Sequence, residues 1–333
     1  MKQWKTLIAA TLTAVFAGAV LTGCGGSAEL GPTPPKEAAA QLKFNGKDVP
    51  LYEYKGAELP KLQGYDTSLA LTKDAIYAIS IDGEKKYHLQ KIQLKDGAIT
   101  AVEDLGSALR APVTSDGTNI YYIPEKGKLG IYDGKAATSV DVTNVHTFRA
   151  VFGGKNGYMS QNFVSDSDVL SGTLSKEGLK DPKTVLSKDV YKARYEAKDE
   201  TYETNPYFIW ADADGFYISS LASHDSDHKK WTEPFHMYSP DGKLLRTFKI
   251  NEGIPSDAEK LDGNERQAIA TKDYVVFYTT GCLRVFNKKD GAYVGDVELK
   301  IDKHSLMPEG VAADEANRIY FIDDKTHIYR IDL

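Results

Sequence analysis

Short runs of apolar and aromatic β-forming residues recur along this chain, and each run follows a polar turn. The runs read KDAIYAIS, GTNIYYIP, KNGYMSQN, ADGFYISS, KDYVVFYT and ANRIYFID. They are anchored at Ile76, Ile120, Tyr158, Phe216, Val276 and Ile319. Successive anchors are 44, 38, 58, 60 and 43 residues apart. Tyr, Ile, Val and Phe are typical of half-buried strands, and self-similarity at this spacing indicates a repeat architecture.

A second strand pattern follows each of the first five runs and ends in a tight-turn signal: IQLKDG, GIYDG, GTLSKEG, MYSPDG and VFNKKDG. Asp-Gly between strand patterns favours a hairpin, because Gly adopts positive φ without strain. One more strand follows each turn and another precedes each anchor, which gives four short strands per unit. The pattern predicts an all-β fold, a six-bladed β-propeller of four-stranded antiparallel blades over residues 41–333. The alternative is an irregular β-sandwich with coincidental spacing.

The final unit, RIYFIDDKTHIYRIDL, stops where the tight turn of the other units would come. Arg318 to Asp323 and His327 to Leu333 are its strands, and an outer strand is missing. The segment from Leu42 to Lys55 has strand character but belongs to no unit. We therefore expect this N-terminal strand to join the C-terminal blade, close the ring and leave fewer open sheet edges.

The last unit also resembles a known repeat. Residues Pro308 to Asp314 read PEGVAAD and precede NRIYFIDD, which is similar to the Pro-x-Gly-Val-Ala element and following strand of NHL-type propeller repeats. YSPDGKLLRTF, from Tyr238 to Phe248, resembles the outer hairpin of that family. The other units depart from the full element. The resemblance implies the fold and no particular function, because propellers serve binding, scaffolding and catalysis alike.

The N-terminus has the pattern of a secretory signal: Lys2 and Lys5, an apolar run from Leu7 to Val20, then LTGC ending at Cys24. The run is too short for an ordinary membrane span. LTGC resembles the bacterial lipoprotein signal, which implies a signal peptide over 1–23, cleavage before Cys24, and acylation of its thiol and amine, for example with palmitate. Several acyl chains hold a protein stably on a membrane. Plain secretion is the alternative.

Residues 24–40, CGGSAELGPTPPKEAAA, form the lipidated cysteine and a Gly-, Pro- and Ala-rich tether. We expect the domain to be anchored at the cell envelope, on the outer membrane or the extracytoplasmic face of the cell membrane. Cys282 is the only other cysteine, in a strand pattern typical of a buried thiol. The formal charge of −6 becomes −8 once Lys2 and Lys5 are removed, so nucleic-acid binding is not indicated.

Candidate binding residues lie where the innermost strands begin. In a propeller these entrances share one face with the loops between second and third strands. They carry Asp66, Arg110, Arg149, Tyr207, Arg266 and Glu309. Arginine offers paired donors to carboxylate, phosphate or sulfate, so three arginines at one channel mouth predict an anionic ligand or acidic partner. In the alternative, the arginines pair with neighbouring acids such as Asp66, Glu265 or Glu309.

Two long insertions, Ser187 to Pro206 and Leu221 to Phe235, fall on that same face. Long loops often carry function. Their aromatic residues and neighbours could stack on a sugar or peptide: Tyr195, Tyr202, Tyr207, Trp210 and Trp231. Structural packing is the alternative reading of these side chains. Four residues of the second insertion could also ligate a transition metal: His224, Asp225, Asp227 and His228.

Motifs for catalysis are sparse. The sequence contains no Gly-x-Ser-x-Gly elbow, no Walker loop and no Cys-x-x-Cys-His haem site. We therefore expect a non-catalytic, membrane-anchored propeller that binds a protein, small molecule or glycan, with no cofactor and a divalent metal left open. The main alternative is a metal-dependent hydrolase or lactonase with Glu309, Asn205, Asn264 and Asp66 at the central channel. A scaffold subunit of an envelope machine is a third possibility.

Overall fold

The computed structural model describes residues 31–333 apart from 65–66, 142–148, 154–155, 161–167, 176–177, 188–205, 221–234, 262–266 and 325. Every regular element in this part of the chain is a β-strand, which confirms the all-β prediction. No helix in the described residues has the length and apolar character needed to span a membrane.

Within the described chain, four antiparallel sheets have four strands each, in chain order. The first has β7 (Thr114–Ser115), β8 (Ile120–Tyr122), β9 (Lys128–Tyr132) and β10 (Ala137–Asp141). The second has β11 (Arg149–Gly153), β12 (Asn156–Ser160), β13 (Val169–Ser175) and β14 (Gly178–Leu186). The third has β15 (Pro206–Asp212), β16 (Gly215–Ser220), β17 (Phe235–Tyr238) and β18 (Leu244–Phe248). The fourth has β19 (Ala268–Ala270), β20 (Tyr274–Thr279), β21 (Cys282–Asn287) and β22 (Tyr293–Glu298).

The remaining sheet joins both ends of the described chain. Its path is β25-β26-β27-β2-β6-β5-β4-β3, and β1 pairs with β2. The early strands are β1 (Ala40–Phe44), β2 (Lys47–Gly56), β3 (Ala70–Thr72), β4 (Ala75–Ile81), β5 (Tyr87–Lys95) and β6 (Ala98–Ala108). The late strands are β25 (Glu309–Ala313), β26 (Arg318–Asp323) and β27 (His327–Asp332). A small hairpin of β23 (Lys300–Ile301) and β24 (His304–Ser305) stands apart.

Strand β2 connects two groups of strands. It pairs antiparallel with β27, where Leu51 lies opposite Ile331 and Tyr54 opposite Ile328. Its last residues then pair parallel with the start of β6, Lys55 opposite Ala98. The N-terminal strand β2 thus stands beside the C-terminal strand β27.

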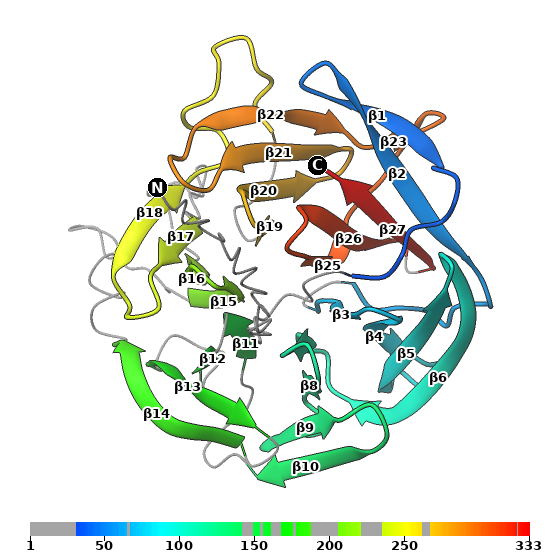
Figure 1. The fold of residues 1–333 in the computed structure, drawn as a ribbon, viewed down its shortest axis with the longest axis vertical. Helices are drawn as coiled ribbons and strands as arrows, with labels where there is room; N and C mark the ends of the chain where they lie inside the picture. Colours follow the sequence, from blue (N-terminus) through cyan, green and yellow to red (C-terminus); the bar gives the residue numbers. More distant parts are fainter. Residues whose placement is uncertain are drawn as a thin grey trace, which may run out of the picture.

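The sheets are arranged around a common centre, with β3, β11, β15, β19 and β25 toward the middle and β6, β10, β14, β18 and β22 at the outside (Figure 1). Radially arranged, twisted antiparallel sheets define a β-propeller. Apolar clusters fill the seams between neighbouring sheets. One contains Tyr217, Phe235, Phe277 and Phe286, in which the Phe235 and Phe277 rings meet edge to face at 6.0 Å across two sheets.

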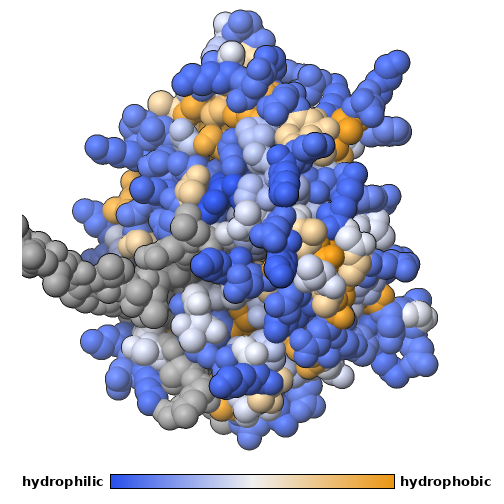
Figure 2. Space-filling model, turned by 45° about the vertical axis from the view of Figure 1, so that its right-hand side comes forward, coloured by the Kyte–Doolittle hydropathy of each residue, from blue (hydrophilic) through white to orange (hydrophobic). Residues whose placement is uncertain are grey.

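The two ends of each sheet carry different connections between strands. In a four-stranded meander the first and third turns lie at one end, and the second turn and the link to the next sheet lie at the other. We name the end with the first and third turns the first-turn face, and the opposite end the linker face. The side of the molecule seen in Figure 2 is mostly polar, with apolar side chains in small separate patches.

Residues 31–39 lie against the propeller. Gly31 and Pro32 are buried, and the Ala39 amide donates to the Leu51 carbonyl at 2.7 Å. The sequence pattern assigned these residues to the tether. We call residues 31–35 the N-terminal strap, because they cross the seam between β27 and the β5–β6 turn.

The thiol of Cys282 on β21 is partly buried. Burial, reinforced by the nearby Asp296 carboxylate, raises its pKa to about 12. The group is therefore a neutral thiol near pH 7, and a thiolate is what nucleophilic or metal-binding cysteine chemistry needs.

Candidate functional site

The structure places the predicted binding residues unevenly. Arg110 is exposed in the link between β6 and β7 on the linker face. Arg149, Tyr207 and Glu309 lie at the starts of the inner strands β11, β15 and β25. Asp66 and Arg266 lie outside the described residues, and so do the side chains of Arg149 and Tyr207. The ring of three arginines therefore stays a prediction.

Most of the two insertions also lies outside the described chain. The four potential metal ligands His224, Asp225, Asp227 and His228 belong to this part, as do Tyr195, Tyr202 and Trp231. In the described residues, no group of three or more His, Cys, Asp or Glu side chains is placed to hold a metal ion. Trp210 is described, and its position agrees with the packing alternative. It lines a cavity on the first-turn face and packs against the apolar core.

A pocket of ≈ 610 Å³ opens on the linker face beside the start of β25. Its walls are the β23–β24 hairpin, the β26–β27 turn and the neighbouring parts of β2 and β27. The lining residues are Glu53, Ile301, Asp302, His304, Ser305, Leu306, Met307, Glu309, Asp323, Asp324, His327 and Tyr329. Glu309 is the predicted site residue that this pocket contains. We call it the linker-face pocket.

Local hydrogen bonds hold the walls of the linker-face pocket. The Leu306 carbonyl accepts from the Gly281 amide at 2.7 Å, and this fixes the β23–β24 hairpin to the end of β20. The Met307 amide donates to the Asp323 carboxylate at 2.7 Å, which joins the hairpin to the β26–β27 turn. Gly64 packs directly on Glu309, since a Cβ at Gly64 would lie 2.1 Å from the Glu309 Cβ. The pocket is therefore preformed by backbone contacts.

The lining of the linker-face pocket is acidic. It contains five carboxylates and two histidines, and none of the described lining residues is Lys or Arg. His327 Nε2 lies 4.0 Å from a Glu53 carboxylate oxygen. Burial, together with the charges of Glu53 and Asp323, raises the pKa of Tyr329. The negative electrostatic potential of this lining favours a positively charged ligand. Met307, which is 43% exposed, adds an apolar contact at the rim.

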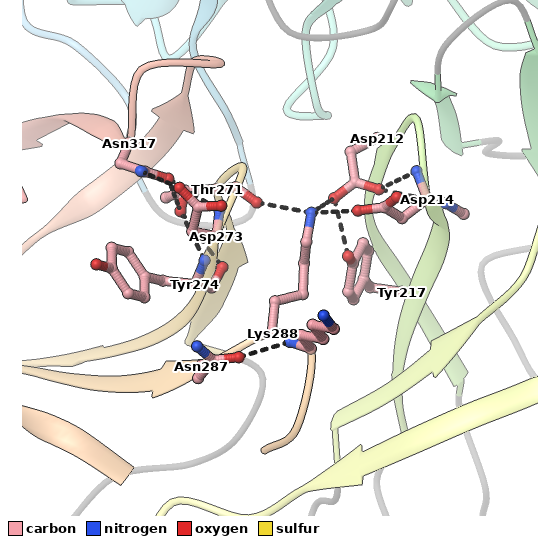
Figure 3. Close-up of polar contacts among 11 residues, drawn as sticks. Asp212, Asp214, Tyr217, Thr271, Asp273, Tyr274, Asn287, Lys288 and Asn317 are labelled. Carbon is pink, nitrogen blue, oxygen red and sulfur yellow. Dashed lines mark hydrogen bonds and ion pairs between the residues drawn. The ribbon is translucent and has the colours of Figure 1, made fainter. Parts of the chain in front are cut away.

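A second polar site lies on the first-turn face, and the sequence pattern did not indicate it. Lys288 extends from the end of β21 toward the neighbouring sheet, and its Nζ lies 2.7 Å from Asp214 and 3.1 Å from Asp212 (Figure 3). It also donates to the Thr271 carbonyl at 3.0 Å. The Lys288 and Asp212 side chains are each only 8% exposed.

The acids around Lys288 are held by their own turns. Asp212 accepts from the Asp214 and Gly215 amides and, at 2.8 Å, from the Tyr217 hydroxyl. The network continues from the β19–β20 turn to the β25–β26 turn. There the Asn317 side chain accepts a hydrogen bond from Thr271 and donates one to Asp273 (Figure 3). First turns of three sheets are thus cross-linked around a cavity of ≈ 300 Å³.

The chemistry of this cluster is structural. Burial acts to lower the pKa of Lys288, but the charges and hydrogen bonds of Asp212 and Asp214 outweigh it and raise the pKa. A protonated ammonium with all its donors engaged can act neither as a nucleophile nor as a base. The cluster therefore ties the sheets together and leaves the linker-face pocket as the candidate binding site.

The shape of the chain is similar to that of several solved proteins at low sequence identity. The WD40 β-propeller domain of Doa1 is 9% identical over 89% of this chain and 96% of that chain, with a TM-score of 0.40. BamB from Moraxella catarrhalis is 10% identical over 90% and 93%, with a TM-score of 0.41. The computationally designed Ika8 protein is 13% identical over 88% and 82%, with a TM-score of 0.39. No family model matches the sequence, and no curated protein matches it. The fold assignment rests on the strand pairing itself.

Proposed function

We propose that this protein is a membrane-anchored, extracytoplasmic lipoprotein whose propeller binds a partner through its linker face without catalysing a reaction. The observation that carries the proposal is the preformed linker-face pocket, which joins an acidic lining to the exposed Met307 side chain. Preformed concave sites with a few convergent polar groups are the usual places for ligands. The anchor is supported by the LTGC tetrapeptide that ends at Cys24.

We further infer that the ring has six blades and that β2 is the outer strand of the last one. The antiparallel pairing of β2 with β27, from Leu51–Ile331 to Tyr54–Ile328, supports this closure. Closure that joins the two ends of a chain removes open sheet edges and makes the ring cooperative. A rigid platform of this kind keeps the walls of the linker-face pocket in place.

The chemistry of the pocket favours a basic partner over the anionic one expected from the arginines. Carboxylates from Asp302, Asp323 and Asp324 surround an opening wide enough for a side chain or short peptide segment. A lysine- or arginine-bearing segment of another envelope protein would find charge complementarity here, and Met307 would cover its apolar stem. The preferred partner is therefore a protein with a basic segment.

Photo-crosslinking tests this function at two matched sites. Met307 and Leu245 are similarly exposed, at 43% and 46%, but Leu245 lies on the outer strand β18, away from the pocket. We expect a benzoylphenylalanine at position 307, in cells that make the full chain, to yield one discrete crosslinked product. The same group at position 245 should yield none. Equal products at both sites, or none at 307, would contradict a partner at this pocket.

A further inference from the structure

We propose that the N-terminal strap fixes how the propeller stands on the membrane, with its first-turn face toward the bilayer and the linker-face pocket directed away from it. This orientation rests on the proposed acylation of Cys24. It identifies the partner as one that approaches from the aqueous side and is not embedded in the same membrane.

The strap is bound to the first-turn face at its beginning. The Gly31 amide donates to Asp314 Oδ2 at 3.0 Å, and Asp314 follows β25 in the first turn of the last sheet. The Pro32 carbonyl accepts from Arg330 Nη1 at 2.9 Å and from the Tyr54 hydroxyl at 3.3 Å. Arg330 and Tyr54 are almost fully buried, so these are interior contacts.

The strap leaves the seam beside the β5–β6 turn. A Cβ placed on Gly97 would lie 2.3 Å from the Pro34 carbonyl oxygen, so the strap backbone presses on Gly97 in the β5–β6 turn. At this turn the last residues of β2 pair with the start of β6, so the strap ends beside these two strands. Gly97 has φ +78°, and both this conformation and the close approach exclude a side chain. The Asp314 contact thus places the beginning of the strap, the end nearest Cys24, at the first-turn face.

Chain length then limits how far the face can stand from the lipid. Seven residue steps separate Cys24 from Gly31, since 31 − 24 = 7. A fully extended chain spans at most about 3.6 Å per step, which gives a reach of about 25 Å. A strand of six residues rises about 20 Å, so an inverted propeller would hold Gly31 at least that far above the bilayer. In the inverted orientation, residues 24–31 would have to be stretched close to their maximum length. In the proposed orientation they need no such stretching.

Two exposed lysines provide matched reporters for the orientation. Lys272 lies in the β19–β20 turn on the first-turn face, and Lys303 lies in the β23–β24 turn beside the linker-face pocket. In a Cys282→Ala background, Lys272→Cys and Lys303→Cys each carry one fluorescent donor, and acylated Cys24 does not react with the label. The full lipoprotein is placed in phosphatidylcholine vesicles that contain an acceptor-labelled lipid, and energy transfer from the donor is measured.

We expect transfer from position 272 to exceed transfer from position 303 by about twofold or more, because the two faces are separated by about the rise of a strand. Insertion of about 20 Gly and Ser residues after Gly26 about doubles the typical reach of the tether, which grows with the square root of its length, and should largely abolish the difference. Equal transfer from both positions, a reversed order, or a difference that the insertion leaves intact would overturn the proposed orientation.

Co-flotation with the vesicles separates this proposal from the proposed anchor. The acylated chain should float and Cys24→Ala should stay in solution. If the parent chain floats but both positions transfer equally, the anchor stands and the orientation is wrong. If the parent chain fails to float, the anchor is wrong and the orientation falls with it.

Discussion

In the described residues, buried and partly buried cations pair with acids that lie both near and far along the chain. Arg284 is fully buried and donates from Nε and Nη2 to Asp296 at 2.9 and 2.7 Å. Arg318 pairs with Asp314 at 2.7 Å, and Lys288 with Asp212 and Asp214. Such pairs add little net stability when intact, but removal of one partner leaves an uncompensated buried charge. The structural role proposed for Lys288 can therefore be tested in two steps. The first variant removes the charge of Lys288, and the second also removes the charge of Asp212.

Replacement of Lys288 by Met should lower the free energy of unfolding by about 3–5 kcal/mol, because Asp212 remains buried without its cation. The measurement is urea denaturation at pH 7. The matched control is Lys289→Met at the exposed neighbouring position, which should change stability by less than about 0.5 kcal/mol. The double variant Lys288→Met with Asp212→Asn should recover part of the loss. A loss no larger than that of the control would refute the cross-linking role.

Residue types alone could not reveal the Lys288 cluster. Lys288 is 76 residues from Asp212, and it sits in VFNKKDG, where an adjacent lysine is exposed. Which of the two lysines points inward depends on the register of β21 and on the twist of the sheet. The one weak signal in the sequence is an aspartate that recurs at the end of the first strand of several sheets. Asp116, Asp212 and Asp314 all follow an inner strand and accept from a tyrosine of the next strand.

At the scale of elements, the tight turns made most of the fold predictable. Glycine has positive φ at Gly97, Gly134, Gly242 and Gly291, where the sequence shows Asp-Gly at third turns. These signals mark the outer hairpins, and the aromatic runs between them mark the second strands of the sheets. The extra hairpin of β23 and β24 has no such signal, because its two-residue strands are too short to show alternation. That hairpin forms a wall of the linker-face pocket, so the pocket was not foreseeable.

A prediction at the scale of elements concerns the stabilising role of strand β2. Deletion of Leu42 to Lys55 should destabilise the whole propeller far more than deletion of residues 25–30, because it removes the ladder to β27 and the buried Leu51 side chain. Burial of one Leu alone contributes several kcal/mol. Melting temperatures of the two deletion variants provide the comparison. Residues 31–40 must stay in the control variant, since the strap occupies part of that range. Equal melting temperatures would exclude a closing role for β2.

At the scale of the whole molecule, the seams between sheets bury many tyrosine hydroxyls. Burial raises the pKa of Tyr54 to about 12 and that of Tyr77 to about 12, and these residues come from different strands of the long sheet. Both side chains are less than 5% exposed. Because an unfolded tyrosine titrates near pH ~10, the folded protein holds these protons to a higher pH than the unfolded chain does.

The free energy of unfolding should therefore fall as pH rises between about 10 and 12, because the folded state binds more protons in that window. Each such tyrosine contributes a slope of up to about 1.4 kcal/mol per pH unit. The Tyr77→Phe variant should show a shallower fall than the parent chain in chemical denaturation at stepped pH. An identical slope would show that Tyr77 ionises as readily in the folded protein as in the unfolded one.

The pairing of β2 with β27 also sets the order of events during synthesis. Leu51 and Ile331 are 280 residues apart (331 − 51 = 280), so β2 is made among the first strands and its partner among the last. Until β27 emerges, β2 has an unpaired edge, and contacts over such separations form slowly. Pairing of β27 with β2 thus becomes the final folding step. A chain interrupted before β27 would keep two open edges and expose them to proteases and chaperones.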